Sequence, residues 1–172
     1  VVRDIAIDQR GRVWFACWDI EADGLQGSGL TMMDPVGFTA ISQKDGLPSD
    51  EVISLSADPQ GRLWAGTVEG VGIWEEGNWS RYTTADGLHR NDAVEISVGP
   101  HGRVWCGFWR GVNVFYDQNW WTWKRERVDY VYKILHGNNN RIYCATKGGL
   151  AIYDGEAWSY ALNQGDLRKW LI

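Results

Sequence analysis

The chain has 172 residues, of which 44% are apolar and 23% charged, a length and composition typical of one folded domain. Its 22 acidic residues against 17 Lys and Arg give a net charge of -5, which argues against nucleic acid as a partner. No apolar run approaches the roughly 20 residues that span a bilayer, and the sequence opens at Val1 without a leader pattern, so we expect a processed or excised piece.

One tetrapeptide occurs four times along the chain: Gly or Asn, then Arg, an aliphatic residue and an aromatic residue. The copies span Gly11–Trp14, Gly61–Trp64, Gly102–Trp105 and Asn140–Tyr143. Their last residues are separated by 50, 41 and 38 positions. A second aromatic marker recurs in phase at 41, 41 and 38 positions, at Phe38, Trp79, Trp120 and Trp158. A repeating unit of about 40 residues follows, and a fixed period of this length decides the architecture.

The second copy shows the strands most clearly. Residues 52–57 alternate as a strand, 58–61 form a turn, and further strands follow over 62–67, 70–74 and 79–83. Asp58-Pro59-Gln60-Gly61 suits a type I turn whose last residue is left-handed. Asn140 replaces this glycine in the fourth copy, and Asn also tolerates positive φ. Four strands per unit predict an all-β β-propeller made of four-stranded antiparallel blades, with a coincidentally repetitive sandwich as the alternative.

We predict a single propeller over residues 1–172, with four blades at about 2–51, 52–92, 93–130 and 131–171. Propellers typically close with 4 to 8 blades. An open arc of four blades leaves an apolar face at each end. We therefore expect part of a larger ring, or an arc completed by self-association or by further blades, with a closed four-blade ring as the alternative.

The second copy also resembles the two-component regulator propeller repeat. Residues 45–52 read DGLPSDEV and residues 58–67 read DPQGRLWAGT, which is the pattern of that family. The third copy keeps Asp86-Gly87-Leu88 but has Phe108 in place of Thr, the fourth lacks the Gly-Leu-Pro connector, and the first departs most. The resemblance implies a sensor propeller of the kind found in bacterial hybrid histidine kinases. It also implies signal transduction and a periplasmic or extracellular location.

One rim of the expected propeller carries the candidate binding residues. In an up-and-down blade, the loop after the second strand and the connector to the next blade share this top rim. The residues at these positions differ between copies while the frame repeats, as expected of a binding surface on a rigid scaffold. A small polar organic ligand or a carbohydrate is the predicted partner. The candidate ligand-binding residues are Trp18, Asp19, Glu69, Arg90, Trp109, Arg110 and Lys147.

Other aromatic residues receive structural assignments. We expect Trp14, Trp64 and Trp105 to pack against the neighbouring blade. For Trp18 and Trp109, the alternative to ligand binding is that they fill the space between blades. Strand alternation is taken to place Trp121 on the opposite face from Trp120 and Trp123. The first copy carries nine extra residues, Glu21–Gly29, which are expected to project from the top rim.

Catalytic and metal-binding motifs are not found. His89 with Glu69 or Asp92 is the one candidate group for a metal-dependent lyase site, and no nucleophile elbow, zinc-protease or nucleotide-binding motif occurs. Cys106 and Cys144 lie at matching places in adjacent blades, about 10 Å apart, which is too far for a disulfide. We therefore expect free thiols, no metal, no cofactor and no enzyme activity.

The leading interpretation is a non-catalytic, ligand-sensing or interaction propeller. A lectin-like carbohydrate-binding propeller and a structural scaffold are the alternatives, and a lyase-like enzyme ranks last. The four loop residues Trp18, Val68, Trp109 and Lys147 are not equivalent, which disfavours a repeated sugar site in each blade.

Overall fold

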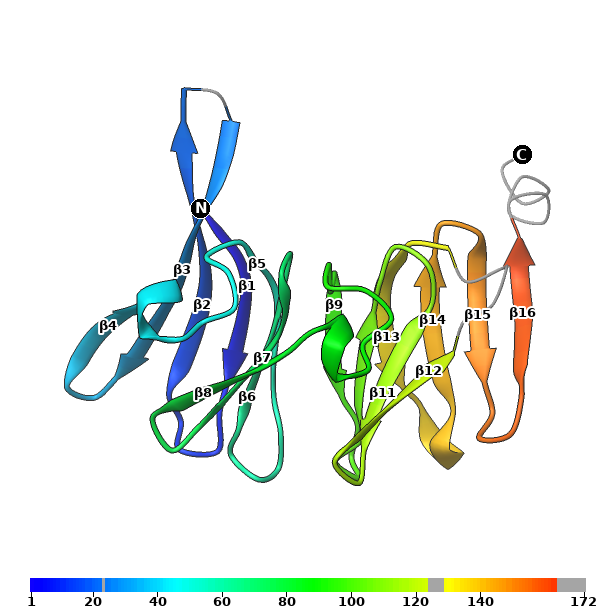
Figure 1. Ribbon diagram of the computed structural model, residues 1–172. Coiled ribbons are helices and arrows are strands. Elements are labelled where there is room, and N and C mark those ends of the chain that lie inside the picture. Colours follow the sequence, from blue (N-terminus) through cyan, green and yellow to red (C-terminus); the bar gives the residue numbers. More distant parts are fainter. Residues whose placement is uncertain (23, 124–128, 164–172) are drawn as a thin grey trace, which may run out of the picture.

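Four antiparallel sheets of four strands each make up the computed structural model, which describes residues 1–22, 24–123 and 129–163. In every sheet the strands lie side by side in chain order, so each sheet is one blade (Figure 1). Blade 1 contains β1 (Val2–Ile7), β2 (Val13–Glu21), β3 (Gly24–Asp34) and β4 (Gly37–Ile41). Blade 2 contains β5 (Val52–Ala57), β6 (Leu63–Thr67), β7 (Gly70–Glu75) and β8 (Asn78–Tyr82). Blade 3 contains β9 (Glu95–Val98), β10 (Val104–Gly107), β11 (Val112–Tyr116) and β12 (Asn119–Trp123). Blade 4 contains β13 (Val131–His136), β14 (Ile142–Thr146), β15 (Gly149–Tyr153) and β16 (Trp158–Asn163).

The predicted β-propeller architecture is confirmed. The first strands of the blades, β1, β5, β9 and β13, pack on one another in that order. In Figure 1 blades 1 and 4 lie at the two ends of the resulting arc, with blades 2 and 3 between them. No comparable packing joins β13 to β1 in the described part of the chain, so the arc is open there. The predicted blade boundaries include residues 124–128 and 164–171, which lie outside the described residues.

The glycine of the repeated turn is required by backbone geometry. Gly11, Gly61 and Gly102 have φ values of 76°, 84° and 73°, and Asn140 has 59°, so all four copies turn through the left-handed region as predicted. In the second blade the turn is closed by the amide of Asp58, which donates to the carbonyl of Arg62 at 2.9 Å.

The repeated tryptophan of the first three copies fills the space between two blades, as predicted. Trp14, Trp64 and Trp105 are buried, and each packs on aromatic side chains of the following blade. We call the face of a blade that meets the following blade its forward face, and the opposite one its rear face. Phe38 on β4 is exposed because no blade packs on the rear face of blade 1.

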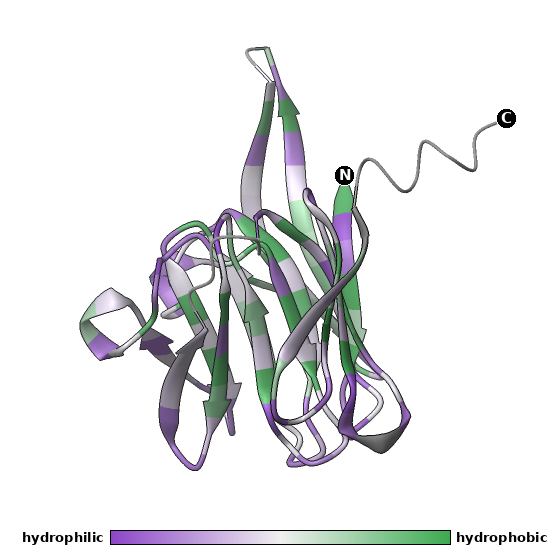
Figure 2. Ribbon diagram, turned by 90° about the vertical axis from the view of Figure 1, so that its right-hand side faces the viewer, coloured by the Kyte–Doolittle hydropathy of each residue, from purple (hydrophilic) through white to green (hydrophobic). Residues whose placement is uncertain are grey.

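The nine additional residues of the first blade extend its second and third strands. The pairs Trp18↔Gly27 and Glu21↔Gly24 continue the ladder between β2 and β3, so this segment is a two-stranded ribbon. The ribbon projects beyond the sheets in Figure 1 and again in Figure 2, where the strands alternate between hydrophobic and hydrophilic residues. At its base the amide of Gly29 donates to the carbonyl of Asp50, 2.9 Å away, which fixes the ribbon to the connector leading into blade 2.

One assignment on β12 is wrong. Trp121 pairs with Val114 and Trp123 pairs with Val112 across β11 and β12, so both tryptophans lie on the forward face of blade 3. Trp120 lies on the rear face and packs on Trp64. Because residues two apart on a strand share a face, Trp123 lies on the same face as Trp121 and not on the face of Trp120.

The cysteines are free, as predicted, and two of them are buried. Burial, and secondarily the nearby charge of Glu95, raises the pKa of the Cys106 thiol well above its usual value. The same causes raise the pKa of Cys144 to about 12.

Among the described residues no helix is long and apolar enough to cross a membrane.

Candidate ligand site at the hub

The first strand of each blade carries one polar residue at an equivalent position next to the propeller axis. These residues are Asp4, Ser54, Glu95 and Lys133. The register of β1 with β2, of β5 with β6 and of β13 with β14 shifts by one residue just before this position. Such a bulge bends the strand and redirects the side chain. The four blades thus bring four different side chains toward one hub.

Three of these side chains tie neighbouring blades together. The carboxylate of Asp4 accepts a hydrogen bond from the amide of Leu55 at 2.6 Å. Ser54 accepts from the amide of Ile96 at 3.0 Å in the same way. Glu95 accepts from the amide of Ile134 at 3.2 Å. Each blade therefore caps a backbone amide of the next one.

Lys133 ends this series because an ammonium group can only donate. Its Nζ lies 2.9 Å from Oε1 of Glu95, pointing back to blade 3. Glu95 is buried, whereas the Lys133 side chain is mostly exposed, so the ion pair reaches the solvent at the hub. The hydroxyl of Ser54 lies 3.5 Å from the second oxygen of Glu95.

A cavity of about 280 Å³ opens between the four first strands, close in size to known small-ligand pockets. Its charged lining comes from blades 1, 3 and 4, and its aromatic lining comes from the start of β13 and the residue before it. The lining side chains that can orient a ligand are Arg3, Asp4, Glu95, Lys133, Tyr130 and Tyr132. Both signs of charge face the same space, which suits a polar ligand with donors and acceptors.

An aromatic series extends from this cavity to the predicted rim. The rings of Tyr130 and Tyr132 are 4.9 Å apart between centroids, and Tyr130 meets Trp109 edge-on at 5.4 Å. Trp109 is 49% exposed, so its ring surface is available at the rim. The amide of Lys147 donates to the carbonyl of Tyr130 at 2.9 Å, which places this residue on the same segment. Of the predicted residues, Trp109 and Lys147 are the two that the structure brings to the edge of the hub cavity.

The other predicted residues lie elsewhere. Trp18 is 8% exposed and donates from its indole to the carbonyl of Val52 at 2.7 Å, so it joins blades 1 and 2. Asp19 is exposed on the ribbon, paired with Gln26 across the two strands, and Arg110 is exposed beside Trp109.

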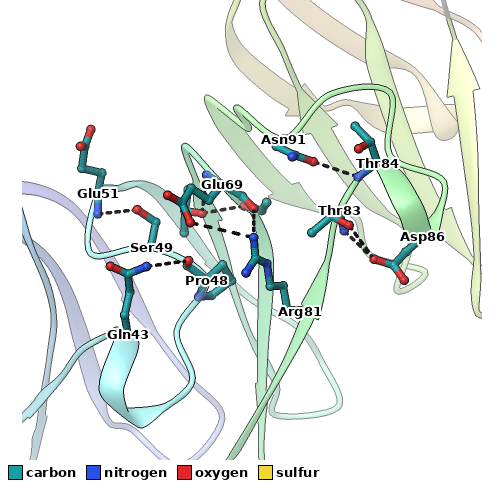
Figure 3. Close-up of polar contacts among 12 residues, drawn as sticks. Gln43, Pro48, Ser49, Glu51, Glu69, Arg81, Thr83, Thr84, Asp86 and Asn91 are labelled. Atoms are coloured by element: carbon teal, nitrogen blue, oxygen red, sulfur yellow. Dashed lines mark hydrogen bonds and ion pairs between the residues drawn. The ribbon is translucent and has the colours of Figure 1, made fainter.

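Two predicted residues pair with neighbouring charges. Arg90 contacts Asp92 through two bonds of 2.6 and 3.0 Å, which raise the pKa of this arginine. Glu69 faces Arg81 at 3.9 Å, a contact shown in Figure 3.

The first two connectors between blades, those into blade 2 and blade 3, are built as copies of each other. Each of the two starts with a hydroxyl residue that caps a short 3-10 helix, and the helix aspartate accepts from that residue's own amide, as for Thr83 and Asp86 at 2.8 Å (Figure 3). The next glycine, Gly87, has a φ of 105°, and Leu88 then turns into the core. The Asp-Gly-Leu sequence therefore serves to end the short 3-10 helix of the connector. The first connector repeats this arrangement from Ser42 to Leu47.

Residues 46–69 match the family model described as Two component regulator propeller. The chain carries a repeat of the two-component regulator propeller family. The matched segment runs from the glycine of the first connector through β5 and β6, which are the elements described above. No curated protein matches this chain.

Solved structures similar to this propeller include extracellular domains of two component systems and a lyase. A chain described as the extracellular domain of a hybrid two component system from B. thetaiotaomicron superposes with a TM-score of 0.80 at 19% identity, covering 96% of this chain and 23% of that one. A second such domain from that organism gives 0.72 at 14%, covering 94% and 22%. Virginiamycin B lyase from Staphylococcus aureus gives 0.72 at 16%, covering 92% and 54%. At these identities the likeness is one of fold, and the chain spans under a quarter of the two sensor domains.

Sequence reasoning missed the hub residues. Asp4, Ser54, Glu95 and Lys133 sit at one position of the repeat and differ in every copy, which is the signal that could have identified them. For the candidate group of His89 with Glu69 or Asp92, the described residues show no gathering of three His, Cys, Asp or Glu side chains that could hold an ion.

Proposed function

We propose that this chain is a non-catalytic, ligand-sensing propeller that belongs to the extracytoplasmic part of a two-component sensor. Its ligand is a small polar organic molecule, such as a sugar, that binds in the hub cavity. The two-component regulator repeat at residues 46–69 and the similarity to extracellular domains of hybrid two component systems support the role and the location.

The observation that carries the proposal is the hub cavity itself. Residues from all four first strands line it, so a ligand there contacts every blade at once. A ligand that fits one spacing of the blades better than another stabilises that spacing. Tyr130 and Tyr132 offer ring surfaces for stacking, and Lys133 and Asp4 offer a donor and an acceptor. Binding can thus become a change in the relation between blades, as a sensor requires.

The arrangement of the carboxylates supports binding over catalysis. Asp4 accepts from the amides of Ile5 and Leu55, and Glu95 accepts from Ile134 while it pairs with Lys133. Both carboxylates thus already serve a structural role, in which they hold backbone amides of the neighbouring blade. A lyase reaction, as suggested by the virginiamycin B lyase named above, is therefore the weaker hypothesis for this chain.

Ligand screening on matched variants tests the proposal. Sugars, amino acids and small organic acids are screened by thermal shift, and hits are titrated by calorimetry against wild type, Tyr132→Ala and Lys133→Gln. Phe38→Ala is the control, since it removes an exposed aromatic ring on β4 that does not line the hub cavity. We expect a hit to lose about tenfold or more in affinity in the two hub variants and to bind the control normally. A hit that binds all four proteins equally contradicts the hub site.

The open ends of the arc support a second partner, namely further blades or a second copy of this chain. Val2, Ile5 and Ile7 are exposed on blade 1, and Leu135 is exposed on blade 4, whereas Leu55 and Ile96, the counterparts of Ile5, are buried between blades. Light scattering of the purified chain tests self-association. A strict monomer at high concentration contradicts completion by a second copy.

A further inference from the structure

The repeated arginine plays a fixed structural part in blades 1 and 2. In blade 2 the Asp58 carboxylate accepts from Nε of Arg62 at 2.6 Å and from the indole of Trp64 at 2.8 Å. In blade 1 the equivalent group is Asp8 with Arg12 and Trp14, at 2.6 and 2.9 Å. The aspartate thus holds the arginine along the repeated tryptophan, where both arginine side chains are mostly buried.

Blade 3 lacks this aspartate. Gly99 stands at its position, although the turn is otherwise unchanged, with the Gly99 amide donating to the Arg103 carbonyl at 2.8 Å. His136 of blade 4 fills the place of the missing carboxylate: a Cβ on Gly99 would lie 2.9 Å from its Cε1. Within the described part of the chain, Arg103 has no carboxylate within 4.0 Å. Its guanidinium instead lies over the ring of Tyr116 at 4.6 Å, exposed to solvent.

Arg103 lies at the mouth of a groove between blades 3 and 4. The groove has a volume of about 410 Å³, within the range of small-ligand sites. Its lining is mostly aromatic, with Tyr116, Trp121 and Trp123 from blade 3 and Tyr153 from blade 4. Trp121 is 59% exposed, so a large part of its indole surface is open to the groove.

A second arginine, Arg141, lies at the same junction, where the charge of Asp154 also acts on it. Blade 4 also has a glycine, Gly137, where blades 1 and 2 have aspartate. Arg141 and His136 line a small cavity of about 40 Å³ that shares Arg103 with the groove. Two arginines without the repeat's aspartate therefore lie at this one junction between blades.

We propose that the groove between blades 3 and 4 binds a six-membered ring that carries a carboxylate. The ring stacks on Trp121 and Tyr116, as flat aromatic rings and the apolar faces of sugar rings do. The carboxylate receives the paired N–H groups of Arg103, which match its two oxygens. Arg103 can do this because Gly99 leaves it without the aspartate that holds its counterparts. The site is separate from the hub and stands whether or not the hub binds a ligand.

Matched pairs of probes test this ligand class by calorimetry and tryptophan fluorescence. Benzoate is compared with benzyl alcohol, and glucuronate with methyl glucoside, so that each pair differs mainly in the carboxylate. We expect at least one carboxylate to bind with a Kd of about 1 mM, and its neutral counterpart about tenfold more weakly. The better of the two carboxylates then shows whether the ring is aromatic or a sugar acid. If neither carboxylate binds more tightly than its neutral counterpart, the proposal is overturned.

Variants then locate the binding. Arg103→Gln should weaken the carboxylate about tenfold and leave the neutral probe unchanged, whereas Trp121→Ala should weaken both. In the double variant Gly99→Asp/His136→Ala, the first change restores the aspartate of the repeat and the second removes the side chain that occupies its place. This variant should also abolish the preference for the charged probe. Phe38→Ala, which removes an exposed ring that lines neither cavity, is the control and should bind normally. Near-ultraviolet circular dichroism verifies the fold of each protein. Carboxylate binding that survives Arg103→Gln unchanged refutes the assignment.

Discussion

Replacing Asp58 by Asn tests how strongly one buried carboxylate stabilises blade 2. Its Oδ1 accepts from the amides of Gln60 and Arg62 at 3.0 and 2.9 Å, and its Oδ2 accepts from the side chains of Arg62 and Trp64 at 2.6 and 2.8 Å. Asparagine keeps the first oxygen but puts an NH₂ group where the second one was. That group is a donor facing two donors, so both side-chain bonds are lost.

The loss is large because Trp64 is completely buried. An indole N–H left without an acceptor in the core costs about 1–3 kcal/mol. The charged bond to Arg62 adds about 1 kcal/mol, since that side chain reaches some solvent and is screened there. We expect the free energy of unfolding to fall by about 3 kcal/mol, which for a chain of this length lowers Tm by about 6–12 °C.

Chemical and thermal denaturation of the two proteins, followed by circular dichroism, measures this difference. Glu75→Gln is the control, because it makes the same charge change at an exposed residue of the same blade. If Asp58→Asn and Glu75→Gln differ by less than about 0.5 kcal/mol, the buried carboxylate is not a main support of the blade, and the contrast drawn with Gly99 loses its basis.

Three further measurements follow from the packing and the charges. Burial alone would raise the pKa of Asp8, but hydrogen bonds from Trp14 and Arg12 lower this pKa below its ordinary value of 3.8. The stabilisation of the fold by Asp8 is therefore full above about pH 5 and is lost as the pH falls through 3.8 and below. Acid titration of the stability of wild type and Asp8→Asn should show the two curves converging at low pH. Gly66→Ala should destabilise the fold by about 1–3 kcal/mol in urea, since the new Cβ would lie 2.9 Å from a side-chain carbon of blade 3, and an unchanged midpoint would show that the blades can separate freely. Iodoacetamide at pH 8 should modify Cys17 well before the two buried thiols with raised pKa, and equal labelling of all three under native conditions would mean that the junctions between blades open readily.

The architecture was predictable because the repeat marks every blade with the same few residues. A left-handed turn at Gly61 and a tryptophan three residues later can be placed from spacing alone, and the strand bounds of blade 2 follow within a residue or two. Gly46 and Leu47 likewise mark the first connector, because backbone geometry and core packing demand a glycine and a leucine there, as they do at Gly87 and Leu88 in the second. Constraints that repeat with the fold leave a periodic trace in the sequence.

The candidate site was less predictable because its side chains are redirected by local irregularities. The register shift before Lys133 sets which residue of β13 reaches the hub, and no period of two reveals it. Trp18 was assigned to the rim from its loop position, but the lengthened β2 continues as a strand there and turns the indole under blade 2. Gly99 leaves Arg103 without the repeat's aspartate, but the place of that carboxylate is filled by His136, 33 positions beyond Arg103, and only the three-dimensional structure shows this contact.

The bonds from Asp4, Ser54 and Glu95 couple each blade to its immediate neighbour only. Such a linear series behaves like a stack of repeats, in which local opening is cheapest where a unit has a single neighbour. Amide protons in β7 and β10, which belong to the two middle blades, should accordingly exchange with solvent more slowly than those in β3 and β15. The gradient of exchange rates along the arc would then report how far a bound ligand, or an added blade, spreads its stabilising effect from one unit to the next.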